Sequence, residues 1–256
     1  MYARALLLRN CGRYTMVRSD FGSDYATCHF LSEESLYAGL TREETRKFGR
    51  IDANMQSDFL TGYDVSARPI WFTPGMFVES IEESDTLLKT DRVKYNVVDE
   101  IVPSTSKSTV FDKKGNRNFI DRNNIATFGS IESVLPNQKV FTIGISKEER
   151  FLSCYAPQDV YLMGKKRTMF EVLGVSDVVR LQEDELQETI PTQVQMEDLN
   201  EYFSYTIHDV NARYFLVQGK ALKCWRVHFY LDGKSITRFL PGVFVERAER
   251  YFGGSS

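Results

Sequence analysis

The sequence predicts an α+β protein built on an antiparallel sheet, and three patterns along the chain support this class. An apolar segment, residues 2–9, ends at the turn-like residues 10–12 and predicts a first strand. A helical pattern begins soon after it, at Ser32. Near the end of the chain, Asp232 and Gly233 separate two alternating segments, as in a two-residue β-hairpin. A strand, a helix, further strands and a closing hairpin are typical of helices packed on an antiparallel sheet.

The composition is that of an ordinary globular chain. Of the 256 residues, 42% are hydrophobic and 26% are charged, which disfavours wholesale disorder, a collagen-like chain or a coiled-coil rod. No run approaches the roughly 20 apolar residues of a membrane helix, and the first ten residues contain no signal-peptide core. We therefore expect one domain over residues 1–252, no membrane partner and a cytoplasmic location.

The four cysteines do not indicate a disulfide or metal-binding arrangement. Cys11, Cys28, Cys154 and Cys224 lie far apart and form no C-x-x-C pair, so neither a zinc site nor a disulfide pattern is predicted. We expect reduced, mostly buried thiols, and neither a metal nor a cofactor.

The first half of the chain predicts a strand, helices and further strands in that order. Residues 2–9 contain few polar side chains, which favours a central strand. Ser32 precedes two glutamates and then apolar residues at helical spacing, so it is the expected N-cap of a helix. Thr41, with a glutamate three residues later, predicts a second short helix.

In the next region, residues 67–97, prolines and the alternation of apolar and polar side chains indicate extended structure. Pro69 and Pro74 make residues 67–75 extended rather than helical. Residues 76–81 and 93–97 alternate between apolar and polar side chains, which predicts strands with one solvated face. Residues 103–124 are rich in Ser, Thr, Lys, Gly and Asn and predict a long exposed excursion.

The second half predicts strands, a helix and a hairpin. Residues 140–145 and 168–173 have the β-branched and aromatic content of strands. One helical face is expected from the spacing of Met196, Leu199, Tyr202 and Phe203. Residues 224–231 and 236–240 form the expected hairpin, and residues 253–256 a flexible tail.

Charge is segregated along the chain although the net charge is only −3. Residues 177–201 contain many acids and one base, Arg180. The segment 162–170 contains no acid and carries Lys165, Lys166 and Arg167 directly after Gly164, which lets a backbone approach a phosphate. A second basic stretch holds Lys113, Lys114, Arg117 and Arg122. Each stretch is either a phosphate-binding surface or merely a solvated or disordered loop.

No catalytic signature is present: the sequence contains no G-x-S-x-G, Walker, H-E-x-x-H or G-x-G-x-x-G motif. The three histidines, His29, His208 and His228, are isolated from one another. We interpret His228 as a structural residue of the terminal hairpin. His29 lies in the segment that also carries Tyr25, and a metal-independent ribonuclease could use both with Lys165.

Several segments, in order, resemble one family. They are residues 2–9; the segment carrying Gly22, Tyr25, Thr27, His29 and Leu31; Ala67-Arg68-Pro69-Ile70; Ala126-Thr127-Phe128-Gly129 with Leu135-Pro136; and Leu162-Met163-Gly164-Lys165, which is similar to an L-G-K motif before a strand. Together they resemble the subunit of type I-D CRISPR interference complexes (Cascade) that caps the 5′ handle of the guide RNA, a member of the RAMP superfamily of RNA-binding proteins.

The resemblance implies an RRM-like (ferredoxin-like) antiparallel sheet with an extended thumb, expected at residues 85–124. It implies no catalysis, because guide processing belongs to a separate endonuclease subunit. The implied partners are the 5′ handle of the guide crRNA and the backbone and large subunits of an antiviral ribonucleoprotein; contact with target DNA near the protospacer-adjacent motif is left open. The implied RNA contacts are Arg18, Tyr25, His29 and the two basic stretches. The alternatives are an endoribonuclease that processes repeat RNA and a protein-interaction module without RNA.

Overall fold

The computed structural model describes residues 1–14, 17–20, 25–27, 30–41, 65, 68–84, 95–102, 108–111, 117–120, 127–163, 168–210 and 214–253. Its largest sheet is centred on strand β1 (Tyr2–Asn10), which lies between β11 (Lys139–Ser146) and β13 (Thr168–Val175). All described pairings in this sheet are antiparallel. The other members are β12 (Val160–Met163), β6 (Gly75–Val78), β4 (Phe30–Leu31), β5 (Ile70–Phe72) and β14 (Val179–Arg180). The predicted central first strand is thus confirmed.

Helix α1 (Glu33–Leu40) begins where the sequence predicts it. The Ser32 hydroxyl accepts a hydrogen bond from the Ser35 amide at 3.2 Å, and Glu33 and Glu34 lie in the first turn. Thr41 is the C-cap of the helix, and both its amide and its hydroxyl donate to the Tyr37 carbonyl. The second helix predicted to begin there falls in residues 42–64, outside the described part of the chain.

A second sheet is organised by one long strand, β18 (Phe215–Leu231). Its first part lies between β16 (Thr192–Val194) and β17 (Tyr202–Val210), and its later part between β15 (Gln182–Glu188) and β19 (Lys234–Pro241). The predicted terminal hairpin is confirmed: Asp232 and Gly233 have φ of 52° and 76°, as a type I′ turn requires.

The helix expected over residues 196–203 is wrong. A short 3₁₀ helix, η5 (Glu197–Glu201), is followed at once by β17. Met196 and Phe203 are 75% and 71% exposed, whereas Tyr202 is buried. The apolar residues at helical spacing therefore belong to a turn and to the strand that follows it, and they do not form one buried helical face.

Two further expectations need correction. All four residues of β6 are buried, so this strand has no solvated face, and the chain then turns into the 3₁₀ helix η4 (Ile81–Glu83). Cys11 and Cys154 are exposed, contrary to the expectation of mostly buried thiols, while Cys224 is buried; all three are free. Cys28 lies outside the described residues.

The two sheets share one core. The rings of Phe141 on β11 and Phe229 on β18 are 6.1 Å apart, and a Cβ at Gly174 of β13 would lie 3.3 Å from Leu231 of β18. Helix α4 (Gly242–Phe252), which the sequence analysis did not predict, buries Phe244, Ala248 and Phe252 against this core. A five-residue helix, α3 (Glu149–Ser153), packs beside β11 and β1.

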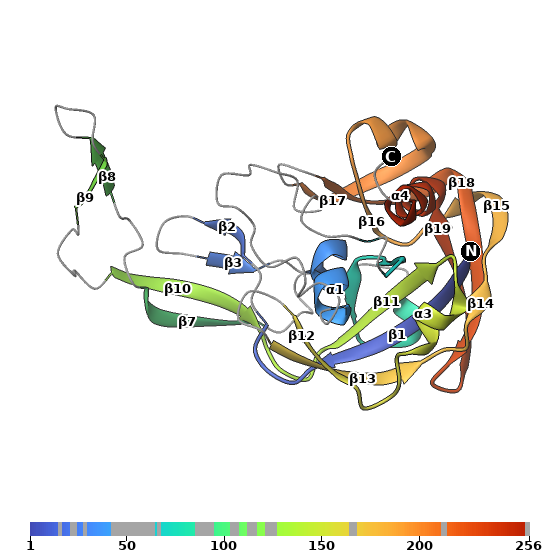
Figure 1. The fold of residues 1–256 in the computed structure, drawn as a ribbon, viewed down its shortest axis with the longest axis horizontal. Coiled ribbons are helices and arrows are strands. Elements are labelled where there is room, and N and C mark those ends of the chain that lie inside the picture. Colours follow the sequence, from blue (N-terminus) through green and yellow to red (C-terminus); the bar gives the residue numbers. More distant parts are fainter. Residues whose placement is uncertain are drawn as a thin grey trace.

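The excursion predicted around residues 103–124 contains regular structure, contrary to its loop-like composition. Strands β7 (Tyr95–Val102) and β10 (Thr127–Val134) pair along their length, and β8 (Ser108–Phe111) and β9 (Arg117–Ile120) form a hairpin between them in sequence. We call β7, β8, β9 and β10 the arm. Figure 1 shows it extending away from the two sheets, with the β8–β9 hairpin at its far end. At its near side, β3 (Tyr25–Thr27) pairs with β10 and β2 (Val17–Asp20) pairs with β3.

The α+β class with mainly antiparallel sheets is therefore confirmed. Among the described helices, none is both long and apolar enough to cross a membrane.

Candidate functional site

The predicted RNA-binding residues fall in two regions of the fold. Arg18 lies on β2, Tyr25 on β3, and Arg117 is the first residue of β9; the structure describes their backbone only. The remaining predicted residues lie outside the described part of the chain: His29, Lys113, Lys114, Arg122, Gly164, Lys165, Lys166 and Arg167. Met163 and Thr168, which flank the last four of these, are paired across β12 and β13.

The topology unites segments that are far apart in sequence. Arg18 and Tyr25 belong to the same sheet as β7 and β10, and Tyr25 pairs with Ile131 in the middle of β10. Lys113, Lys114 and Arg122 are joined in sequence to the β8–β9 hairpin of the arm. Thus Arg18, Tyr25 and Arg117, which are far apart in sequence, lie on the arm and on the strands beside it.

A buried asparagine fixes the junction between the arm and the largest sheet. Asn10 is fully buried at the end of β1, and its side-chain amide donates to the carbonyls of Gly12 and Leu135 at 3.0 and 2.8 Å. Its side-chain oxygen accepts from the Gln138 amide at 2.7 Å. Because each of these bonds joins the β1 end to itself or to the turn after β10, Asn10 holds the two connections together.

Tyr14 and Thr168 extend this junction. Tyr14 exchanges backbone hydrogen bonds with Val134, the last residue of β10, and its buried ring packs edge-on against Phe170 at 5.6 Å. The Thr168 hydroxyl donates to the Arg13 carbonyl at 2.6 Å. Thr168 is the residue directly after the basic segment 164–167 in the sequence, and the structure describes it at the base of the arm.

Cations that the sequence analysis did not single out lie at the same junction. Arg13 and Lys139 are exposed, and Lys139 lies across from Arg9 on the neighbouring strand. Arg9 is paired with Glu171, and the hydrogen bond that Arg9 donates to that carboxylate raises the pKa of Arg9. Arg13 therefore places a cationic residue beside Thr168, the residue that follows 164–167 in the sequence. Only the fold brings Arg13 and Thr168 together, because they are far apart in sequence.

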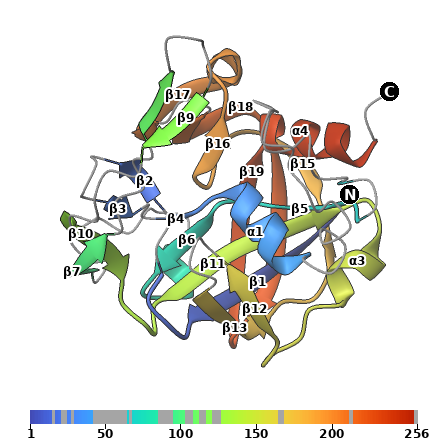
Figure 2. The same ribbon diagram turned by 60° about the vertical axis from the view of Figure 1, so that its left-hand side comes forward.

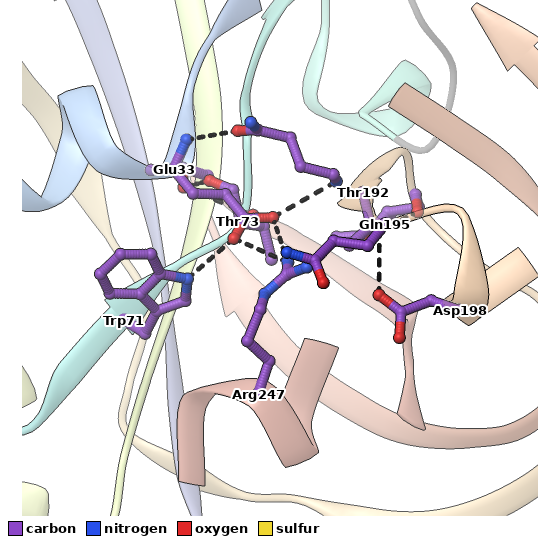
Figure 3. Close-up of polar contacts among 10 residues, drawn as sticks. Glu33, Trp71, Thr73, Thr192, Gln195, Asp198 and Arg247 are labelled. Atoms are coloured by element: carbon purple, nitrogen blue, oxygen red, sulfur yellow. Dashed lines mark hydrogen bonds and ion pairs between the residues drawn. The ribbon is translucent and has the colours of Figure 1, made fainter. Parts of the chain in front are cut away.

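A separate, buried ionic cluster connects both ends of the chain (Figure 3). Glu33, the first residue of α1, accepts two hydrogen bonds from Arg247 of α4, both at 2.8 Å. The Trp71 indole N–H of β5 donates to the same carboxylate at 2.8 Å. Gln193 of β16 donates its amide N–H to Glu33 and accepts the Glu33 amide through its side chain. One carboxylate thus joins α1, β5, β16 and α4.

The environment of Glu33 is that of a structural clamp. The side chain is 2% exposed, and burial raises its pKa to about 7 because loss of solvation outweighs the attraction of Arg247. Burial by itself would lower the pKa of Arg247, but the combined attraction of Glu33, Tyr251, Asp198 and Glu34 outweighs it and raises the pKa. With both groups removed from solvent, the cluster offers no access to a polymer such as RNA.

The two described histidines have ordinary structural surroundings. His228 bonds through Nδ1 to the Thr237 hydroxyl at 2.9 Å and through Nε2 to the Ser235 hydroxyl at 3.2 Å, within the predicted hairpin. His208 lies on β17, where burial lowers its pKa. Among the described residues, no group of three or more His, Cys, Asp or Glu side chains could hold a metal ion.

Comparisons with known proteins give distant likenesses. No family model matches the chain, and no curated protein matches it. A chain of the type III-B Cmr-beta complex bound to cognate target RNA and AMPPnP is 9% identical, with a TM-score of 0.41 and 96% of this chain and 88% of that chain covered. A CRISPR protein from Archaeoglobus fulgidus is 11% identical, with a TM-score of 0.33 and coverages of 93% and 99%. A chain of a CRISPR RNA-guided surveillance complex is 12% identical, with a TM-score of 0.29 and coverages of 98% and 99%.

Proposed function

We propose that this chain is a non-catalytic RNA-binding subunit of a CRISPR interference complex of type I-D, built on an RRM-like core, that holds the 5′ handle of the guide RNA. The ordered resemblance of its segments to the handle-capping family supports the family and the subtype. The finer roles follow from the arrangement at the base of the arm.

The observation that carries the proposal is the bond between Thr168 and Arg13. It ties the start of β13, which follows the cationic residues 164–167 in the sequence, to Arg13, which precedes β2, the strand beside the arm, in the sequence. Arg13 and Lys139 add exposed positive charge at this place. A concave or linear array of cations tracks a single-stranded phosphate chain, while its bases stack on aromatic side chains. The handle would then follow the junction toward the arm.

Holding an RNA end requires no general base. Positioning phosphates needs only cations, backbone amides and stacking faces, whereas cleavage needs a base within hydrogen-bond reach of the 2′-hydroxyl. We therefore propose that His29 and Tyr25 do not catalyse cleavage. The rival endoribonuclease would use these two residues together with Lys165.

One experiment separates the three functions. Purified protein is incubated with repeat RNA and followed by gel shift and denaturing gel. Retention without cleavage supports the handle-binding subunit; cleavage supports the endoribonuclease; no interaction supports a protein-interaction module and would overturn the proposal.

The basic segment is tested with Lys165→Ala, Lys166→Ala and Arg167→Ala in one variant. Each lost phosphate contact should lower the slope of log affinity against log salt by about 0.7 for a single strand. The matched control changes Lys220, Lys223 and Arg226 of β18 to Ala, which removes the same charge from another sheet. Equal affinity and slope in the two triple variants would contradict the assigned role of residues 164–167.

A further inference from the structure

Strand β17 presents an unusual edge. It is nine residues long, and among the described strands it pairs only with β18. Four of its apolar side chains are strongly exposed: Phe203 at 71%, Val210 at 56%, Tyr205 at 45% and Ile207 at 40%. Figure 2 draws β17 near the upper edge of the view, away from β1. A long apolar edge is a ready template for pairing with another strand.

The opposite side of the same sheet is protected in the usual way. Strand β15 carries four acids in seven residues, Glu183, Asp184, Glu185 and Glu188, and Lys223 of β18 lies 3.4 Å from one of them. Charged edge strands resist pairing with other chains. On β17 the only side chain that carries a full charge at neutral pH is Asp209. One sheet thus has a blocked edge and an open edge, and this contrast argues that the exposure of β17 serves binding.

Charge around β17 restricts what binds there. The 3₁₀ helix η5, directly before the strand, carries Glu197, Asp198 and Glu201, and Asp209 lies near the other end of β17. The exposed cation Lys220 lies opposite Ser204. The surroundings are therefore mainly acidic, which disfavours a phosphate backbone and favours a cationic occupant.

A second copy of the chain fits poorly. Antiparallel pairing of β17 with itself, centred between Tyr205 and Thr206, would bring Glu201 of one copy beside Val210 and Asp209 of the other. Like charges so placed repel. A different chain with complementary charge avoids this repulsion.

We propose that β17 accepts an extended segment of a partner protein in which apolar residues alternate with Lys or Arg, and that this segment adds a strand to the sheet. Main-chain hydrogen bonds would provide affinity, while the exposed apolar side chains and the acids of η5 would provide specificity. The inference rests on the proposed function only in that a subunit of a complex needs a surface for its protein partners.

The test uses the full chain and a fluorescein-labelled nine-residue peptide of alternating valine and lysine. Fluorescence anisotropy should show saturable binding, at least tenfold tighter than to the same peptide with glutamate in place of lysine. Amide hydrogen exchange across residues 203–210 should slow on binding, since strand addition protects edge amides. Binding without slowed exchange would overturn strand addition, and equal affinity for the two peptides would overturn the charge argument.

Three variants locate the surface. The double variant Phe203→Ser, Val210→Ser should lower the affinity for the peptide at least tenfold. The double variant Glu197→Lys, Glu201→Lys should lower it about fivefold or more. All four side chains are exposed, so these variants should fold. Tyr230→Ser, which removes a 61% exposed aromatic from the far end of β18, is the control and should bind as the parent does. Equal binding by all variants would overturn the assignment to β17.

The same variants can show whether RNA or a second copy of the chain binds at β17 instead of a peptide. Binding of nine-nucleotide oligouridine that the serine variant abolishes would overturn the proposal in favour of RNA. A concentration-dependent dimer in gel filtration that the serine variant abolishes would overturn it in favour of a second copy. Loss of repeat-RNA retention with peptide binding intact would contradict only the proposed RNA function.

Discussion

At the scale of single residues, the clearest determinant is the carboxyl group of Glu33. It is the only described acid that accepts hydrogen bonds from both an arginine and an indole, and it lies 2% exposed among four elements. Removal of one partner from a buried ion pair leaves an uncompensated charge and typically costs about 3 to 5 kcal/mol. The stability of the fold should therefore be sensitive to this one group.

The raised pKa of Glu33 predicts a pH dependence. Because the folded protein holds the proton up to about pH 7 and the unfolded chain releases it near 4.5, the folded state binds more protons within this window. The contribution of Glu33 to the free energy of unfolding should therefore be greatest below pH 4.5 and fall by about 3 kcal/mol as the pH rises through 7. Urea unfolding of the parent and of Glu33→Gln between pH 4.5 and 8 measures it.

Glu33→Gln has no proton to lose, so the difference between the two proteins should change with pH in the stated direction. The same difference at every pH would contradict the titration of Glu33. Glu185→Gln is the matched control: it changes an exposed acid of β15 that is not among the groups that shift the pKa of Glu33, and it should leave the slope of the parent unchanged.

Arg13 carries the second prediction at this scale. Its carbonyl accepts a hydrogen bond from Thr168, the residue that follows the basic segment in the sequence, and its side chain is exposed. If it contacts one phosphate, Arg13→Ala should weaken repeat-RNA binding and reduce the salt slope by about 0.7. Filter binding at several salt concentrations checks this. Arg180→Ala, another exposed arginine at the far end of the same sheet, is the control; an equal effect of both would show only loss of general charge.

At the scale of elements, the sequence predicted the helices and strands for which the local residue pattern favours the same structure as the tertiary contacts. Strand β1, the α1 N-cap at Ser32 and the β18–β19 hairpin each follow from side chains within one short segment. The prediction of a helix over 196–203 was wrong because Tyr202 is buried through its pairing with β18. The residues around Tyr202 give no local indication of this pairing. Helix α4 was missed although Val243, Phe244, Ala248 and Phe252 have helical spacing after Pro241.

The candidate site could be predicted only in part for the same reason. The runs of cations are visible in sequence, but the proximity of Arg13 to Thr168 follows only from the fold, through their hydrogen bond and the buried Asn10 nearby. The regular structure of the arm was hidden by Ser, Thr, Gly and Asn, which are typical of loops. Its strands pair with each other across many intervening residues, and the sequence gives no local sign of this pairing.

The terminal hairpin carries a prediction about its turn. Gly233 has a φ of 76°, which a residue with a Cβ adopts at a cost, so Gly233→Ala should lower the free energy of unfolding by about 1 kcal/mol. Asp232→Asn is the control, because Asn accepts a positive φ at least as readily as Asp. Chemical denaturation of both variants measures the difference; equal stability of Gly233→Ala and the parent would show that the turn does not depend on its glycine.

At the scale of the whole molecule, the two sheets should unfold together because they bury one another. The rings of Phe141 and Phe229 meet between them, and Glu33 and Arg247 join the first helix to the last. A molecule with a shared core should show a single cooperative transition, as expected of one domain. This property distinguishes a single unit from two sheets that merely touch.

Phe229→Ala tests this coupling. Truncation of a fully buried phenylalanine typically costs about 3 to 5 kcal/mol, and the loss should appear in both sheets although the change is made in one. Hydrogen exchange of the amides of β1 and of β18 should therefore accelerate by the same factor. Tyr230, the adjacent residue, is 61% exposed. Tyr230→Ala should change the free energy of opening, measured by exchange in β1 and in β18, by no more than about 0.5 kcal/mol. If β18 amides alone accelerated in Phe229→Ala, the sheets would be independent units, and the single domain expected over residues 1–252 would be wrong.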